Sequence, residues 1–159
     1  MKTTAALPAG TPSMTPTGTP PATPTTAGEV VDEFLRLVMI PDPDSARRYT
    51  APGLRIRFTG GRAMKDPADT TAFNKARYQW VKKRIERTET VSISSPSGAP
   101  GETVVYSLGT LYGQWPDGTP FEGNRYVDRY VVREGLIVEM DVWNDSAEWM
   151  LVRAGLAVL

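Results

Sequence analysis

Two aspartates, Asp128 and Asp141, are the residues of this 159-residue sequence whose types and spacing best suit chemistry. Each lies in an apolar-rich stretch that is typical of a β-strand, and a turn at residues 133–135 joins the two stretches. If both side chains point inward from neighbouring strands, they form a pair of carboxyl groups in one pocket. An apolar wall raises the pKa of a carboxyl by up to about 3–5 units for full burial, so one aspartate would act as acid and the other as base.

Polar and aromatic side chains accompany these aspartates. Strand alternation places Asn124, Tyr126 and Tyr130 on the same face as Asp128. We expect Tyr126 and Asn124 to donate hydrogen bonds to negative charge that develops on a substrate oxygen. On the next strand, Trp143 shares a face with the second aspartate. The alternative is that each aspartate pairs with a basic side chain on a solvated outer face, and that the aromatic residues only form core and wall.

The composition excludes several classes of function. The chain has no His and no Cys, which removes the usual general base, the commonest metal ligand and every disulfide. Lys plus Arg equals Asp plus Glu at 18 each, so no net charge favours nucleic acid or an anionic membrane. No apolar run approaches the roughly 18 residues that span a bilayer. We therefore expect a soluble, cytoplasmic protein without a cofactor, a metal, a nucleic-acid partner or a membrane partner.

The first 28 residues differ from the rest of the chain. They are rich in Pro and Thr and nearly free of large apolar side chains, which predicts a disordered segment. A secretory signal is the alternative, but the apolar run at residues 5–7 is too short before Pro8 interrupts it. The sequence therefore predicts one domain, over residues 29–159.

The first part of this domain reads as helices followed by a strand. Apolar residues at helical spacing predict a helix that starts at Glu29 and ends before Pro41. A short helix is expected at residues 44–49. The alternation of apolar and basic residues at 54–58 predicts a strand.

A long helix is expected next. Capping residues at 66–69 precede an amphipathic pattern that continues to Ile85 and places Trp80 on the apolar face. The opposite face is basic and includes Lys83. We interpret this basic face as solvated, because nothing in it is placed to stack nucleic-acid bases.

Strands dominate the second half of the domain. Residues 88–94 and 103–114 read as strands, and residues 115–119 as a hairpin turn that leads to the two aspartate-bearing strands. Asp145 or Ser146 is expected to cap a final helix. This order predicts an α+β fold in which a cone-shaped, curved antiparallel sheet wraps around a long helix and encloses a ligand cavity.

Several short stretches of the chain are similar to a known family. They are Phe34-Leu35-Arg36-Leu37-Val38 before a Pro-Asp turn, Tyr49 before the first strand, Asn124-Arg125-Tyr126-Val127-Asp128, and the run from Gly135 to Asn144. In these stretches and in element order, residues 29–159 resemble the SnoaL-like branch of the ketosteroid-isomerase and nuclear-transport-factor-2-like superfamily. The resemblance implies the cone-shaped fold. It leaves the activity open, because this cone hosts isomerases, polyketide cyclases, dehydratases, epoxide hydrolases and non-catalytic binding modules.

The resemblance to ketosteroid isomerases transfers to the site in part. Asp128 falls where these enzymes carry the protonated aspartic acid of their oxyanion hole. Phe34 stands at the position of their catalytic tyrosine. Arg57 or Phe58 stands at the position of their general-base aspartate. A ketosteroid isomerase proper is therefore disfavoured.

The limonene-epoxide hydrolases offer a second comparison, because they use an Asp-Arg-Asp arrangement. Both of their aspartates have counterparts here, in Asp128 and Asp141, but Tyr126 stands in place of the arginine. Without that cation the two carboxyls cannot both ionise cheaply. Arg55 or Arg57 would restore a positive charge if its side chain pointed inward.

Two functional hypotheses of different classes follow. The first is a small cofactor-free enzyme that performs acid–base chemistry on a hydrophobic small molecule, by isomerisation, cyclisation, dehydration or epoxide opening, with Asp128 and Asp141 as proton carriers. The second is a non-catalytic ligand-binding or dimerisation module. The residues expected to contact the substrate are Trp143, Tyr130, Phe34, Arg57, Phe58 and Trp80.

The resemblance also implies a partner. Members of this superfamily commonly dimerise through the convex face of the sheet, so we expect a homodimer. Val127, Val131 and Leu111 are the apolar residues expected on that face.

Overall fold

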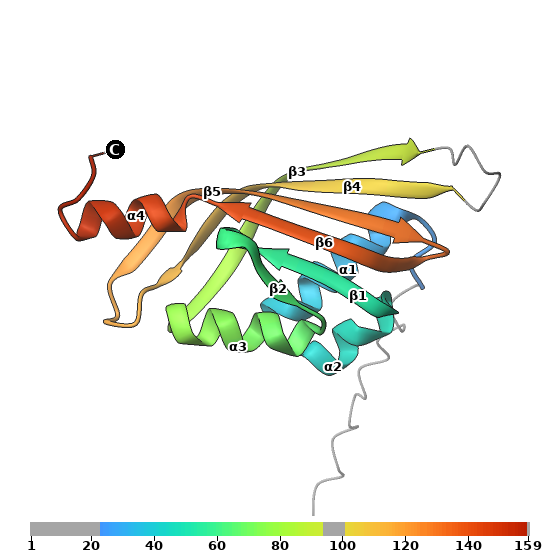
Figure 1. Cartoon of the computed structure of the whole chain (residues 1–159), viewed down its shortest axis with the longest axis horizontal. Coiled ribbons are helices and arrows are strands. Elements are labelled where there is room, and N and C mark those ends of the chain that lie inside the picture. The colour runs from blue at the N-terminus through green and yellow to red at the C-terminus, as the bar shows by residue number, and fades with distance from the viewer. Residues whose placement is uncertain (1–22, 94–100, 159) are drawn as a thin grey trace, which may run out of the picture.

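The computed structural model describes residues 23–93 and 101–158. Within these residues, three helices lie against one side of a curved sheet, and a fourth lies beyond its end (Figure 1). The described part of the sheet has six strands, in the order β2-β1-β6-β5-β4-β3. The helices are α1 (Ala27–Met39), α2 (Pro43–Ala46), α3 (Pro67–Arg77) and α4 (Ser146–Arg153), and short 3₁₀ turns follow α2 and β1. The strands are β1 (Thr50–Phe58), β2 (Arg62–Met64), β3 (Trp80–Ile93), β4 (Glu102–Gln114), β5 (Pro120–Arg133) and β6 (Leu136–Asn144).

The sheet is mixed, and this corrects the expectation that it is wholly antiparallel. β1 pairs with β6 in parallel, whereas the other neighbouring strands pair antiparallel. A parallel pair requires a long connection between its strands, and here most of the domain lies between β1 and β6. Local alternation cannot reveal such a pairing. The three-residue strand β2, which follows the positive-φ turn at Gly60 and Gly61, was also not expected.

Helix α1 fills the concave side of the sheet. Its buried face, which includes Phe34 and Leu35, packs against inward side chains of β1, β4, β5 and β6. The helix starts at Ala27, two residues earlier than expected, because Thr26 and Glu29 form a capping box. Backbone N–H groups of Thr25 and Thr26 donate to the Glu29 carboxylate and lower its pKa to about 2. Most of the expected disordered segment, residues 1–22, lies outside the described residues.

The expected long helix to Ile85 is wrong. Helix α3 ends at Arg77, Tyr78 adopts extended backbone angles, and β3 begins at Trp80. The fourteen-residue strand β3 pairs with β4 along its length, and this ladder outweighs the helical spacing of the apolar residues. Lys83 consequently lies on a strand.

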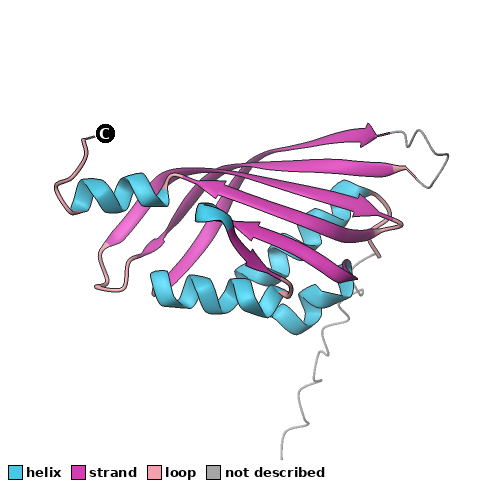
Figure 2. Cartoon of the chain, viewed as in Figure 1, coloured by secondary structure: helices cyan, strands magenta, loops and turns pink. Residues whose placement is uncertain are grey.

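Two glycines on β4 allow β3 to bend across the concave side. A Cβ atom at Gly109 would overlap the carbonyl oxygen of Arg84, and one at Gly113 would overlap that of Trp80. The pairing of β3 with β4 also has a bulge between Ile85 and Arg87, which increases local twist. As a result, the first half of β3 descends toward α3, as Figure 2 shows.

Candidate functional site

Asp128 lies at the centre of the concave side, where its carboxylate is completely buried on β5. Oδ2 accepts an ion-paired hydrogen bond from Lys83 Nζ and a second hydrogen bond, of 2.9 Å, from the Tyr130 hydroxyl. Oδ1 has no hydrogen-bond partner among the residues that the structure describes. One oxygen of this carboxylate is therefore held in place, whereas the other is buried with a hydrogen-bonding capacity that no described residue uses.

Lys83 supplies the positive charge at this site. Its side chain is 16% exposed, and Nζ lies 3.9 Å from the centre of the Tyr126 ring, within cation–π range. The interpretation of Lys83 as part of a solvated helix face is therefore wrong, as is the suggestion that Arg55 or Arg57 provides an inward cation. β-Branched residues recur along β3, and that signal favoured a strand over a helix.

Two tyrosines complete the polar centre. Burial raises the pKa of Tyr126 to about 12, although its 3.0 Å hydrogen bond with the Ser107 hydroxyl opposes this rise and the charge of Asp128 adds to it. Burial, with the nearby Asp128 charge, also raises the pKa of Tyr130 well above its ordinary value. Both phenols are therefore protonated near neutral pH.

The predicted facing of β5 is confirmed, because Asn124, Tyr126, Asp128 and Tyr130 are all buried on the concave side. Asn124 is nevertheless engaged elsewhere, since its Nδ2 donates to Ser146 Oγ at 3.4 Å. It does not line the cavity that Asp128 lines. Its expected hydrogen bond to substrate stays a prediction.

The pairing of two carboxyl groups is wrong, because Asp141 lies on the convex face. In the β5–β6 register Asp128 is opposite Val142, whereas Asp141 is opposite Arg129. The Asp141 carboxylate accepts from Arg57 Nε at 2.7 Å and from Arg129 Nη1 at 3.1 Å. The register between β5 and β6 decides which face Asp141 occupies, since a shift of one residue exchanges the two faces of a strand.

The expected substrate contacts separate into three groups. Only Phe58 lines the cavity. Phe34 and Tyr130 lie in the core, where their rings meet edge to face with centres 6.0 Å apart. Trp143 and Arg57 are exposed on the convex face by their strand register, and Trp80 is an exposed wall of a neighbouring groove. Leu111, expected on the convex face, instead lines the cavity.

The cavity lies between the sheet, the end of α1 and helix α3, and has a volume of about 70 Å³. Its apolar walls come from Leu35, Val38, Met39, Phe58, Val81, Leu111, Met140 and Val142. Several lining residues, among them Met39, Asn74 and Lys82, also line an outer groove of about 440 Å³. The two spaces therefore adjoin one another. Ligand pockets for drug-sized molecules have volumes of roughly 300–1,000 Å³, so a ligand would use both.

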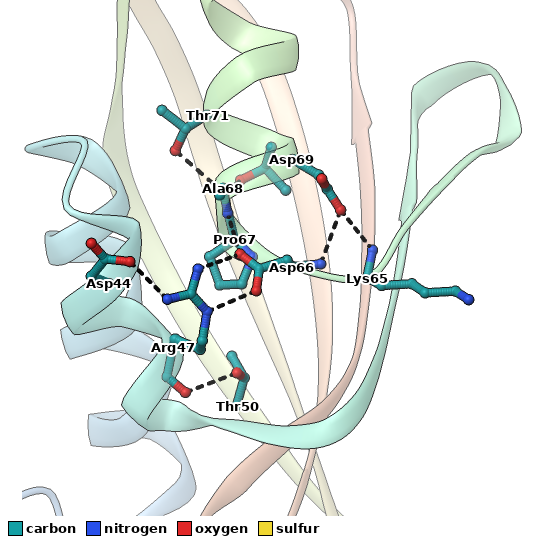
Figure 3. A network of polar contacts seen from close by, with 10 residues as sticks. Asp44, Arg47, Thr50, Lys65, Asp66, Pro67, Ala68, Asp69 and Thr71 are labelled. Carbon is teal, nitrogen blue, oxygen red and sulfur yellow. Dashed lines mark hydrogen bonds and ion pairs between the residues drawn. The ribbon is translucent and has the colours of Figure 1, made fainter.

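An ionic cluster fixes the start of α3, which forms one wall of the cavity (Figure 3). Arg47 Nε and Nη2 donate to the two oxygens of Asp66 at 2.7 and 2.9 Å, and Arg47 Nη1 donates to Asp44 at 2.7 Å. Asp66 caps α3 by accepting from the N–H of Ala68 at 2.8 Å. The Arg47 hydrogen bonds lower the pKa of Asp66, so this clamp is charged near neutral pH.

Comparisons with known proteins concern the fold. A scan against known protein families finds no match, and neither does a search of the curated proteins. Among solved structures, an NTF2-like protein of unknown function from Burkholderia pseudomallei superimposes with a TM-score of 0.59, at 16% identity, over 78% of this chain and 93% of that chain. This chain has the NTF2-like fold.

Two further structures share the NTF2-like fold with this chain. A protein from Jannaschia assigned as a SnoaL-like polyketide cyclase has a TM-score of 0.53 at 17% identity, over 82% of this chain and 96% of that chain. TerC, co-crystallised with polyporic acid, has a TM-score of 0.57 at 13% identity, over 77% of this chain and 93% of that chain. Within the described residues, no helix is long and apolar enough to cross a membrane.

Proposed function

We propose that this protein is a small enzyme that binds a largely apolar molecule in the cavity and moves a proton on it, with Asp128 as the base. The observation that carries the proposal is Oδ1 of Asp128, a buried carboxylate oxygen without a partner among the described residues, on a residue that lines the cavity. Buried polar atoms normally have hydrogen-bond partners, and exceptions occur at functional sites. A substrate C–H or O–H group would approach this oxygen.

The surroundings of Asp128 suit a base. Lys83 Nζ and the Tyr130 hydroxyl both donate to Oδ2, so that the lone pairs of Oδ1 are the ones available to accept a proton. The ammonium group of Lys83 also provides a donor for an oxygen on which negative charge develops. The hypothesis of two aspartate proton carriers is thus replaced by one carboxylate and one ammonium group.

This arrangement serves reactions that begin with the removal of a proton beside a carbonyl group or from a hydroxyl group. Isomerisation, cyclisation and dehydration of a carbonyl compound all start in this way, and epoxide opening starts with deprotonation of a water molecule. The presence of an assigned polyketide cyclase and of the polyporic acid complex of TerC among the structures with this fold supports a small organic ligand.

A non-catalytic binding module is the second candidate. The apolar lining favours it, because such a lining can bind the body of a small molecule without any chemical step. Under this candidate the Lys83–Asp128 pair would orient a polar group of the ligand without transferring a proton.

The decisive experiment measures proton transfer directly. Small cyclic ketones in D₂O report abstraction of an α-proton as deuterium incorporation, which is followed by NMR. We expect the protein to accelerate exchange above the buffer rate and Asp128→Asn to remove about 10²- to 10⁴-fold of that acceleration. Asp141→Asn, on the opposite face, is the matched control and should retain the wild-type rate per folded molecule. Binding of the ketones without any acceleration would favour the binding module.

A further inference from the structure

The charges around the cavity and the outer groove are predominantly positive. Among the described residues, their lining includes four cations, Lys75, Arg77, Lys82 and Lys83, but only one carboxylate, Asp128. The whole chain, in contrast, has equal numbers of basic and acidic residues, 18 of each. The excess of positive charge is therefore confined to the surroundings of the cavity and the outer groove.

Three of these cations lack an acidic partner. Lys83 is paired with Asp128, but Lys75, Arg77 and Lys82 form no ion pair within residues 23–93 and 101–158. Most arginines of the sheet differ in this respect, because cross-strand and loop carboxylates neutralise them. A negative group on a ligand would supply the missing charge.

Arg77 is held in a geometry that suits recognition. It is half-buried at the end of α3, where its guanidinium lies 5.0 Å from the centre of the Phe73 ring and 5.7 Å from that of Tyr78. The only hydrogen-bond acceptor recorded for it in the described part of the chain is the sulfur of Met150, at 3.9 Å. Most of its donors therefore remain available, and a planar guanidinium fixed by aromatic faces matches the two oxygens of a carboxylate.

We infer that the ligand of this cavity is an amphipathic anion, whose carboxylate is bound by Arg77 while its apolar body lies against the walls near Leu35, Val81 and Met140. This inference rests on the proposed function, because it places the ligand in the same cavity. It concerns how the ligand is bound and not the proton transfer by Asp128. A neutral apolar molecule would leave Arg77 without an anionic partner, and a cationic molecule would be repelled.

A matched series of ligands tests the charge. The probes are 1-naphthylacetate, its neutral amide and the cationic 2-(1-naphthyl)ethylammonium, with binding measured by calorimetry in 50 mM NaCl. We expect the carboxylate to bind at least about tenfold more tightly than the amide and the ammonium compound to bind weakest. In 500 mM NaCl the preference should shrink, because salt screens charges near the surface. Equal affinities of carboxylate and amide, or no binding of the carboxylate, would overturn the assignment.

Variants locate the interaction. Arg77→Gln should reduce carboxylate affinity about three- to tenfold and leave amide affinity unchanged. Arg62→Gln is the matched control, because Arg62 also lies over the Phe73 ring, at 5.3 Å, but does not line the cavity or the groove. A loss as large in Arg62→Gln as in Arg77→Gln contradicts the proposal. Asp128→Asn should keep the preference for the anion, so failure of the proton-transfer proposal and failure of this one are distinguishable.

Discussion

Lys83 on β3 and Asp128 on β5 form an ion pair although the whole of β4 lies between their strands. Side chains on strands that are two apart in a flat sheet lie about 10 Å from each other, so this contact depends on curvature and on the length of the lysine side chain. The proposed site therefore depends on the curvature of the sheet, because the bend in β3 brings the Lys83 ammonium group within reach of the Asp128 carboxylate.

Removal of Lys83 should expose how strongly the pair is coupled. Lys83→Met leaves a buried carboxylate without its cation, and we expect a loss of about 3–5 kcal/mol in the free energy of unfolding, measured with urea. Lys82→Met, at the exposed neighbouring position, should change it by less than about 0.5 kcal/mol. The double variant Lys83→Met with Asp128→Asn should recover most of the loss. If Lys83→Met is as stable as the wild type, the pair does not form in solution.

Gly109 should tolerate no side chain. In Gly109→Ala the new methyl group meets the backbone of β3, so the strand must move, at a cost of about 1–3 kcal/mol or more. Proton-transfer activity should fall as well, because Lys83 moves with the strand. Gly28→Ala in α1 is a useful comparison, since its methyl group has ordinary contacts and should be neutral or stabilise by up to about 1 kcal/mol.

The pKa of Tyr126 predicts an alkaline effect. Its folded-state pKa of about 12 lies above the ordinary value of 10.0, so folding keeps the proton on the phenol. The corresponding stability is complete below pH 10 and is lost as the pH rises from 10 toward 12. Phenolate absorbance at about 295 nm should therefore show late-titrating tyrosines that include both Tyr126 and Tyr130, and Tyr126→Phe should remove one of them. Full ionisation of Tyr126 by pH 10.5 in the folded protein would contradict its burial.

Arg47 should stabilise the start of α3, the helix that forms one wall of the cavity. Arg47→Ala removes the clamp on Asp66, and we expect amides in the first turns of α3 to exchange hydrogen faster, while global stability falls by no more than about 1 kcal/mol because the pair is largely exposed. Arg36→Ala removes a comparable exposed pair on α1 and should leave α3 unchanged. Unaltered exchange in α3 would show that packing alone fixes this wall.

The sequence predicted the α+β architecture and the inward-facing residues of β5, but it did not predict the lysine that pairs with Asp128. β5 alternates so regularly that the inward facing of Asp128 and Tyr126 follows from local pattern alone. The position of Asp141 depends instead on the register between β5 and β6, where a single residue decides the face. Lys83 was missed because apolar residues at helical spacing continue past Arg77, and only pairing with β4 makes this segment a strand.

On the convex face, unlike in the cavity, a buried carboxylate is paired with two arginines. Asp141 is 5% exposed there and lies between Arg57 and Arg129, which come from β1 and β5 on either side of β6. One carboxylate thus ties three strands together. Expected homodimerisation through this face remains a prediction, with Val127 and Trp143 as the exposed apolar side chains beside each other in the β5–β6 pair.

Because β1 pairs in parallel with β6, the sheet can be completed only late in synthesis of the chain. β1 is complete at residue 58, but its long partner strand ends only at residue 144, and until then β1 can pair with nothing longer than the three residues of β2. A nascent chain that stops before residue 136 therefore leaves the apolar face of α1 without part of its cover. Ribosome-bound chains of that length should be chaperone clients, and release from the chaperone should coincide with the emergence of β6.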